Sequence, residues 1–185
     1  MLAPGRVATE ADRPPGQSAA YPRVSESTGL AAAEKGVRAT VVRLAPSVHG
    51  DGDHGFVPLL IGMAREKGAA AYIGEGLNRW PGVHRLDAAK LYRLALEKGV
   101  AGARYHGIGE EGVPFREIAE VIGRRLGVPV VSKSGDEAAA HFGWFAYFAG
   151  ADMPASSAQT EAELGWRPTG PGLLADLDNP RYFGG

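Results

Sequence analysis

The residues best suited to chemistry lie in the stretch Val41 to Phe56, which contains a glycine triplet of functional spacing. Gly50, Gly52 and Gly55 form the pattern Gly-x-Gly-x-x-Gly, after an apolar, strand-like run and before a helix-like one. Glycines at this spacing let a backbone approach the pyrophosphate of a dinucleotide at a helix N-terminus. The chain has no other glycine-rich candidate of this kind. The interpretation of this loop therefore decides whether the chain could bind a dinucleotide by itself.

Spacing and charge both weigh against a phosphate-binding role for these glycines. Six residues, Leu44 to His49, separate Arg43 of the strand-like run from Gly50, whereas a phosphate loop begins directly at the end of its strand. Asp51 and Asp53 would each repel a pyrophosphate by about 1 kcal/mol at high dielectric, and by more once partly buried. Glu75 does follow the next predicted strand, as the fingerprint requires. Two interpretations stay open: a phosphate loop, or a solvated loop whose glycines make turns.

No metal site is predicted from the acidic and histidine residues of this loop. Asp51, Asp53 and His54 lie close together, but no third well-spaced neutral ligand accompanies them. The sequence contains no cysteine, which excludes disulfides and cysteine-based zinc sites. The lack of cysteine also suits a cytoplasmic protein.

The composition is that of a folded and nearly neutral protein. Its 185 residues are 44% hydrophobic and 22% charged, which is enough for one ordinary domain or for part of a larger one. A formal net charge of −1 and the lack of a Lys/Arg block predict no binding to nucleic acid. No apolar run approaches the roughly 20 residues that span a bilayer. The N-terminus does not resemble a signal peptide, so we expect no membrane association and a cytoplasmic location.

Helix-like and strand-like segments alternate along most of the chain. Helix propensity, apolar stripes and glycine stops predict helices over residues 24–35, 56–67, 87–98, 115–126, 136–148 and 157–164. Short apolar or β-branched runs predict strands over 37–44, 70–73, 82–86, 104–107 and 129–132. Asp87 is expected to cap the helix that it begins. Such alternation indicates an α/β protein with a parallel sheet.

Three motifs occur in a fixed order along residues 21–176. They are Arg43-Leu44-Ala45-Pro46-Ser47-Val48-His49-Gly50, Val83-His84-Arg85-Leu86-Asp87-Ala88-Ala89 and Leu164-Gly165-Trp166-Arg167-Pro168. The first is similar to the segment after the sixth sheet strand of the NAD-dependent epimerase/dehydratase family. The second is similar to that family's strand followed by a helix-starting Asp, and the third to its late Leu-Gly-Trp-x-Pro turn. The chain thus resembles the extended and atypical short-chain dehydrogenase/reductases.

This resemblance implies an α/β fold that is only part of the family's architecture. We expect a partial NAD(P)-binding, Rossmann-like, doubly wound parallel sheet with a smaller C-terminal α/β substrate domain. Residues 1–20 would be irregular, 21–110 would be the remnant of the Rossmann-like domain with segments of the substrate cleft, and 111–185 would be the substrate-binding portion. No strand and glycine-rich turn precede residue 21. The chain is therefore expected to be a C-terminal portion that lacks the phosphate-binding half.

The resemblance also points to residues for catalysis and for the cofactor. The family pairs a catalytic Tyr with a Lys four residues later, and Tyr21 matches the tyrosine while Ser25 replaces the lysine. A serine cannot supply the positive charge that stabilises a tyrosinate, so Tyr21 is either a catalytic residue without its partner or a packing residue. Ala45, Pro46, Ser47 and Val48 resemble the turn that contacts the nicotinamide, in line with the position of ligands at the carboxyl ends of strands.

Five residues lie near the substrate cleft in the family's layout. These candidate substrate-binding residues are His49, Asn78, Arg79, Trp80 and His84. Arg79 could clamp an anionic group and Trp80 could stack on a ring. The alternative is a surface arginine beside a packed tryptophan.

Two functions from different classes follow from the resemblance. The first is an NAD(P)-dependent oxidoreductase or epimerase-like protein that transfers hydride at a secondary alcohol, a ketone or a nucleotide-sugar. As a fragment, the chain is expected to be inactive alone and to bind NAD or NADP weakly or not at all. The second is a non-catalytic module that senses a nucleotide or binds a partner protein. A small-molecule substrate and self-association into a homo-oligomer are the expected partners.

Overall fold

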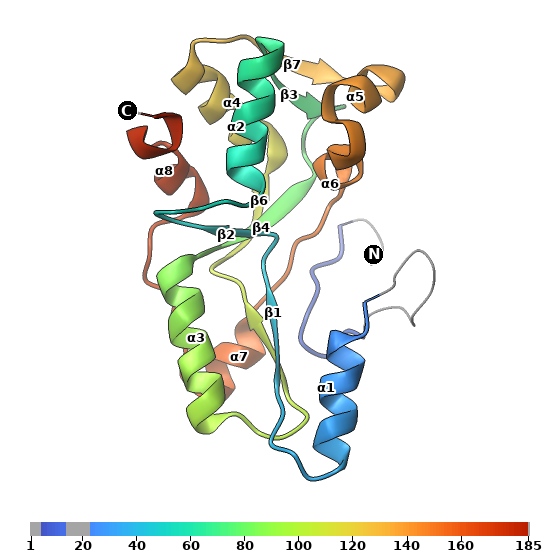
Figure 1. Ribbon diagram of the computed structural model, residues 1–185, viewed down its shortest axis with the longest axis vertical. Coiled ribbons are helices and arrows are strands. Elements are labelled where there is room, and N and C mark those ends of the chain that lie inside the picture. The colour runs from blue at the N-terminus through green and yellow to red at the C-terminus, as the bar shows by residue number, and fades with distance from the viewer. Residues whose placement is uncertain (1–4, 14–22, 185) are drawn as a thin grey trace.

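The computed structural model describes residues 5–13 and 23–184, so the predicted catalytic Tyr21 lies outside the described part of the chain (Figure 1). The helices are α1 (Ser25–Glu34), α2 (Phe56–Lys67), α3 (Arg85–Lys98), α4 (Phe115–Leu126), α5 (Gly135–Phe142), α6 (Ala146–Gly150), α7 (Ala158–Leu164) and α8 (Leu173–Leu177), with 3-10 turns η1 (Gly143–Phe145) and η2 (Pro180–Phe183). The strands are β1 (Val41–Leu44), β2 (Ser47–His49), β3 (Ala70–Ile73), β4 (Arg79–His84), β5 (Arg104–Gly107), β6 (Glu110–Pro114) and β7 (Val130–Lys133).

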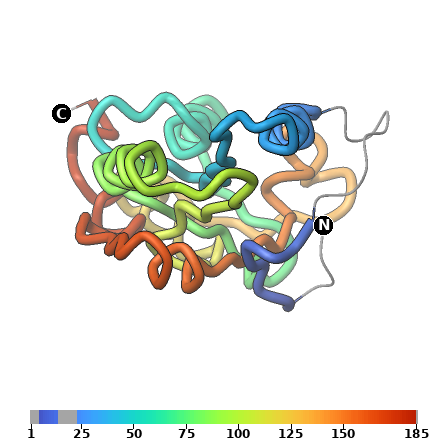
Figure 2. The backbone as a smooth tube through the Cα atoms, turned by 90° about the horizontal axis from the view of Figure 1, so that it is seen from below, coloured from blue at the N-terminus to red at the C-terminus, as the bar shows by residue number. Residues whose placement is uncertain are grey.

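The parallel pair β1–β5 lies in the lower half of the molecule in Figure 1. Val41 is opposite Arg104, and Leu44 is opposite Gly107. Helices α1 and α3 lie on one side of this pair and α7 lies on the other (Figure 2). Parallel strands with helices on both faces are the doubly wound arrangement. The predicted fold class, a partial Rossmann-like α/β structure, is therefore confirmed.

Strand β1 has a neighbour on one edge only among the described strands. Its residues are half-buried, and Leu44 at its end is exposed. The strand that we predicted over 37–44 is present only at 41–44, and its residues are less buried than we expected. The strand begins at Val41 because Gly36 adopts a positive φ and a tight turn brings the Ala39 amide to the Val37 carbonyl.

Two further small sheets lie above the β1–β5 pair. Strand β4 stands between β2, to which it is parallel, and β6, to which it is antiparallel. Strand β3 pairs with β7 in parallel. Neither β2 nor β6 was predicted from the sequence. Both are short and rich in residues that also form turns, so period-2 patterning cannot identify them.

The core divides into two clusters of buried apolar side chains. The upper cluster is aromatic-rich: Trp80, Phe115 and Phe145 have no more than 1% of their surface exposed. The lower cluster lies between the β1–β5 pair, α3 and α7, and includes Tyr105 and Trp166. The lower cluster contains side chains from both sides of residue 110. None of the helices in the described residues is long and apolar enough to span a membrane.

Most predicted helices are present with ends within two residues, and α4 matches its prediction in full. The segment expected to be helical over 136–148 is interrupted at Gly143, as its glycine suggested, where a positive φ separates α5 from the turn η1. The segment expected as a strand over 82–86 is shifted: β4 ends at His84 and α3 begins at Arg85. This shift has a consequence for Asp87, described below.

Candidate functional site

A cavity of about 200 Å³ lies at the carboxyl ends of the parallel strands β2 and β4, beside the start of β6. In open α/β sheets ligands bind outside the carboxyl ends of the strands, so this position suits a ligand site. The lining residues are His49, Gly82, Val83, His84, Asp87, Gly109, Glu110, Pro168, Gly170, Pro171 and Gly172.

Glycines line much of the cavity and keep it open. A Cβ atom on Gly170 would lie 2.6 Å from the Cβ of His84, and one on Gly172 would lie 2.5 Å from a carboxylate oxygen of Glu110. Side chains at these positions would therefore displace the polar groups of the wall. At Gly82 the nearest atom, the Cβ of Leu173, would be 3.4 Å away, so an added methyl group would fit and would narrow the cavity.

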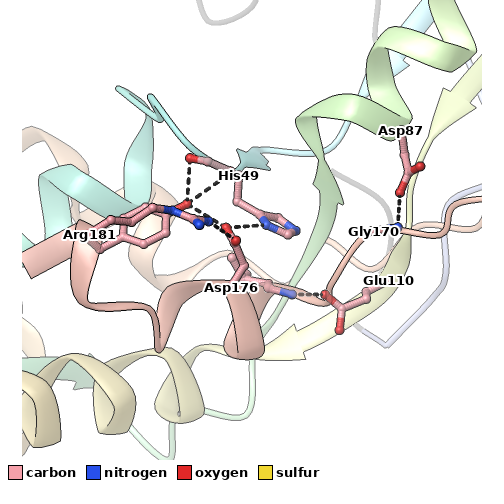
Figure 3. A network of polar contacts seen from close by, with 9 residues as sticks. His49, Asp87, Glu110, Gly170, Asp176 and Arg181 are labelled. Carbon is pink, nitrogen blue, oxygen red and sulfur yellow. Dashed lines mark hydrogen bonds and ion pairs between the residues drawn. The ribbon is translucent and has the colours of Figure 1, made fainter.

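His49 is, together with Asp87, the most deeply buried polar group of the cavity wall. Only 1% of its surface is exposed. Its Nδ1 atom lies 3.1 Å from Oδ2 of Asp176, which comes from α8 far along the chain (Figure 3). The second ring nitrogen, Nε2, points away from Asp176 toward the side where Gly170 and Glu110 lie (Figure 3). Within the described residues, no hydrogen bond to Nε2 is found.

Asp176 is fixed by two further donors. The Tyr182 hydroxyl donates to Oδ2 at 2.9 Å, and Arg181 forms an ion pair with Oδ1. The same Tyr182 hydroxyl accepts the Gly50 amide at 2.9 Å. The Asp176 carboxylate thereby joins segment 176–182 to the loop after β2. It also fixes the His49 ring through its Nδ1 atom (Figure 3).

The electrostatics of this pair fix the protonation of His49. Burial lowers the pKa of His49, although Asp176 counteracts part of that effect. Burial alone would raise the pKa of Asp176, but hydrogen bonds from His49, Tyr182 and Arg181 hold it below its usual value. Near neutral pH the carboxylate is ionised and can only accept. The neutral imidazole therefore carries its proton on Nδ1, and Nε2 has the free electron pair.

His84 and Glu110 contribute two further polar groups to the cavity wall. The Nδ1 atom of His84 is buried and has no hydrogen-bond partner among the described residues, and its ring lies edge-on to His49 with centroids 5.6 Å apart. Glu110 accepts the Leu173 amide at the start of α8. Buried polar groups are almost always paired. The unpaired nitrogen of His84 therefore suggests that a ligand or water binds there.

Asp87 supports the cavity wall and does not cap a helix. The prediction of a cap is wrong because α3 begins two residues earlier, with His84 at the N-cap. The Asp87 carboxylate instead accepts the amides of Thr169 at 2.9 Å and Gly170 at 2.6 Å. Burial alone would raise the pKa of Asp87, but the Gly170 amide, Lys90 and the Thr169 amide together lower it. Asp87 thus holds segment 168–172 over the cavity.

The glycine loop does not fit a pyrophosphate. Gly55 is the N-cap of α2, and its amide donates to Oδ1 of Asp53 at 2.6 Å. A carboxylate of the chain itself thus stands where a phosphate would approach the helix N-terminus. Burial raises the pKa of Asp53, and an added phosphate would increase the local negative charge. The loop is the turn-rich alternative, in which Gly50 and Gly52 have positive φ.

The predicted nicotinamide-contacting turn lies between β1 and β2. The Ala45 amide donates to the Gly107 carbonyl, and Ser47 and Val48 pair with β4. Pro46 is partly exposed between the two strands. The Ser47 hydroxyl is buried and has no partner in the described residues. These contacts leave the turn able to touch a ring from its partly exposed side, but they offer no phosphate cradle.

Three of the predicted substrate-binding residues have structural roles instead. The prediction that Trp80 stacks on a ligand ring is wrong, because its side chain has no exposed surface and donates to the Phe148 carbonyl. Arg79 clamps the carboxylate of Asp152 through Nε and Nη2, at 3.1 and 3.0 Å. Asn78 donates its amide to two backbone carbonyls. The structure matches the alternative of an arginine beside a packed tryptophan. His49 and His84 are the two predicted residues that it brings together.

Sequence reasoning missed the residues that hold His49 in place. Asp176, Arg181 and Tyr182 come from α8 and η2, two short elements that were not predicted, and Glu110 begins the unpredicted β6. Their side chains lie more than sixty residues from His49 along the chain. Ser25, which the sequence resemblance aligned with a lysine, is exposed at the start of α1.

Comparison with known sequences finds relatives but no family model that matches the chain. An uncharacterized protein of Schizosaccharomyces pombe is 50% identical over 179 residues, which cover 97% of this chain and 60% of the relative. An uncharacterized protein of Saccharomyces cerevisiae is 48% identical over 176 residues, 95% of this chain and 59% of that relative. The chain thus spans about 60% of the length of these curated relatives.

Comparison with solved structures shows a shared fold. The dTDP-glucose 4,6-dehydratase DesIV of Streptomyces venezuelae, determined with NAD bound, superposes with a TM-score of 0.73 at 22% identity over 96% of this chain and 54% of its own. A dTDP-glucose 4,6-dehydratase of Bacillus anthracis in complex with NAD gives 0.73 at 18% identity, over 99% of this chain and 57% of that chain. A nucleoside-diphosphate-sugar epimerase of Pseudomonas aeruginosa gives 0.68 at 19% identity, over 94% and 58%.

Proposed function

We propose that this chain forms the substrate-binding part of an NAD(P)-dependent oxidoreductase of the epimerase/dehydratase type. The substrate would be a small molecule with a secondary alcohol or ketone, such as a nucleotide-sugar. The observation that carries this proposal is the cavity at the carboxyl ends of β2 and β4, where His49, His84 and Glu110 converge. The fold that contains this cavity is shared with NAD-bound dehydratases and with a nucleoside-diphosphate-sugar epimerase, which supports the assignment by analogy.

The chain's own part in this function is to bind and orient the substrate. The cavity wall presents an electron pair on His49, the carboxylate of Glu110 and the unpaired nitrogen of His84. The electron pair of His49 and the carboxylate of Glu110 accept hydrogen bonds, so they suit the hydroxyl groups of a sugar, and the diphosphate of a nucleotide-sugar would lie outside the cavity. NAD(P) would supply the hydride acceptor or donor. Because the glycine loop does not fit a pyrophosphate, no phosphate contact is assigned to this chain, and only the turn from Ala45 to Val48 would approach the nicotinamide.

Calorimetric titration of the chain tests this proposal. We expect dTDP-glucose to bind, and we expect NAD and NADP to show no low-micromolar affinity, since Asp53 occupies the N-terminus of α2. The Gly82→Ala variant, which narrows the cavity, should weaken binding of dTDP-glucose. Tight binding of NAD, or binding of dTDP-glucose that Gly82→Ala leaves unchanged, would contradict the proposal.

A non-catalytic module is the second candidate. It is favoured by the exposed Ser25 at the position of the family's lysine, since no cation there stabilises a tyrosinate. The two candidates differ in a measurement on the full-length S. pombe relative. Conversion of a nucleotide-sugar in the presence of NAD, followed by product analysis, supports the oxidoreductase, whereas ligand binding without conversion supports the module.

Self-association is a further expectation of this proposal. Strand β1 presents one edge without a neighbour among the described strands, and Leu86, Leu96 and Val100 are largely exposed along and beyond α3. Free sheet edges and apolar patches favour association. Light scattering should give a mass above that of one chain, and a monodisperse monomer would count against it.

A further inference from the structure

We propose that Nε2 of His49 is the base that takes up the proton of a substrate hydroxyl in the cavity, and that Asp176 is its positioning residue. This inference rests on the proposed function, which places the substrate there. In the step, the O–H bond of the substrate breaks and an N–H bond forms at Nε2. The bonding electrons stay on the substrate oxygen, and the imidazole becomes an imidazolium.

The geometry of the His49 ring supports this role. Nδ1 is engaged with Asp176 at 3.1 Å, so the ring cannot turn without breaking a buried hydrogen bond. Asp176 is itself fixed, because it also binds Tyr182 and Arg181. Nε2 faces the cavity with its electron pair and has no partner in the described part of the chain (Figure 3). A base held by a carboxylate behind it is the arrangement that aligns imidazoles for proton transfer.

The charged and titratable groups around the His49 ring allow it to take up one proton. Asp176 on α8 carries a negative charge. Arg181 and Tyr182 on η2 donate hydrogen bonds to its carboxylate oxygens. Glu110 on β6 also favours the imidazolium, whereas His84 on β4 opposes a second positive charge beside it. Asp53, in the loop after β2, is a further carboxyl group that interacts electrostatically with His49. The imidazolium is therefore stabilised by two carboxylates once it forms, and the buried resting state is neutral.

A base at His49 would also compensate for the serine at position 25. The resemblance places a lysine there to activate the tyrosine, and the serine cannot do so. His49 is the last residue of β2, and its acid–base capacity depends on Asp176 instead of on a lysine.

Carbethoxylation by diethyl pyrocarbonate, mapped by peptide mass spectrometry, tests the inference on the full chain. The reagent modifies neutral imidazoles that have an accessible electron pair. We expect modification of His49 and of the exposed His54, and none of His106, whose two ring nitrogens are both hydrogen-bonded. We expect the rate at His49 to rise with pH around a midpoint below 6.5, because burial lowers its pKa. An unreactive His49 beside a reactive His54 would overturn the inference.

The Asp176→Asn variant tests the positioning role. Loss of a carboxylate behind a functional histidine typically costs tenfold or more, so we expect carbethoxylation of His49 to slow about tenfold while His54 is unaffected. An unchanged rate at His49 would refute the positioning role. If the variant does not fold, nitrogen NMR of the wild-type ring decides instead: a proton on Nδ1 and none on Nε2 is expected, and the opposite tautomer would refute the inference.

Protection by dTDP-glucose separates the inference from the proposed function. If both hold, dTDP-glucose slows the modification of His49 and leaves His54 unchanged. A reactive, correctly titrating His49 that dTDP-glucose does not protect would contradict the substrate assignment alone. A protected His49 with the wrong tautomer would contradict the base alone.

Discussion

Two buried histidines, His106 in strand β5 and His49 at the end of strand β2, differ in how their ring nitrogens are used. Nδ1 of His106 lies 2.8 Å from the Ser156 carbonyl, and its Nε2 lies 3.3 Å from Nη1 of Arg43. His49 uses Nδ1 alone and leaves Nε2 to the cavity. Burial lowers the pKa of both rings. Burial and pKa therefore do not distinguish a structural histidine from a functional one, whereas the unused nitrogen does.

The surroundings of the two histidines follow the same contrast. Beside His106, Glu26 of α1 accepts from both Arg43 and Arg104, so each of these two guanidinium groups has a carboxylate partner. Around the cavity, His84 and Ser47 retain buried polar atoms without partners in the described residues. Since unpaired buried groups are costly and rare, their accumulation at one place indicates the region that a ligand completes.

The largest expected effect comes from Asp176→Ala, which removes the common acceptor of His49, Tyr182 and Arg181. Leaving several buried donors without a partner should lower the free energy of unfolding by about 3 kcal/mol. Asp178→Ala is the matched control on the same segment, since this carboxylate pairs with arginines at the surface. Urea titration should show a much smaller loss for the control, and equal losses would contradict the importance of the buried network.

Asparagine substitutions at the two histidines compare their ring nitrogens directly. An Asn amide can imitate Nδ1 but not Nε2, so His49→Asn keeps its contact with Asp176 while His106→Asn loses its contact with Arg43. We expect His106→Asn to be less stable than His49→Asn by about 1 kcal/mol, the net value of one hydrogen bond. If His49→Asn were the less stable variant in chemical denaturation, Nε2 of His49 would have a structural partner.

Acid should destabilise the protein in a window set by its buried histidines. The pKa values of His49, His106 and His141 are all lowered by burial from 6.5. The unfolded chain therefore binds more protons below about 6.5, and stability falls as the pH drops from there through the folded values. Unfolding free energies measured across this window should decline less steeply in His49→Asn than in the wild type. Equal slopes would show that His49 titrates normally.

The smallest effect on stability is expected for Gly82→Ala. This variant distinguishes an effect on the cavity from an effect on the stability of the fold. The added methyl would make ordinary contacts at 3.4 to 3.6 Å, so stability should change by less than about 0.5 kcal/mol. Carbethoxylation of His49 should nevertheless slow, because the cavity is narrowed. Gly62→Ala on the exposed face of α2 is the control: nothing lies within 4 Å of its added Cβ. That control should gain helix stability and leave His49 reactivity unchanged.

The sequence predicted the elements with strong local signals and missed those that tertiary pairing creates. The apolar stripe of Phe115, Ile118 and Ile122 specified α4 by its period alone. By contrast, β2 and β6 become strands only because β4 lies between them, and no local pattern marks them.

The same distinction applies to the candidate site. His49 and His84 were identified because they belong to motifs that follow strands, and parallel strands bring such ends together. Asp176 could not be identified, because its contact with His49 depends on how the C-terminal segment folds back over 127 residues. Trp80 was misassigned because an aromatic residue beside an arginine has the same sequence signature in a core as in a ligand site.

Nitrogen NMR of the histidine rings, with and without dTDP-glucose, tests the central contrast most directly. At neutral pH both His49 and His106 should be uncharged, with Nε2 unprotonated. On addition of dTDP-glucose, the Nε2 signal of His49 should shift as it accepts a hydroxyl hydrogen, while both nitrogens of His106 stay unchanged. A ligand that binds and moves neither His49 nitrogen, or that moves only His106, would contradict the account.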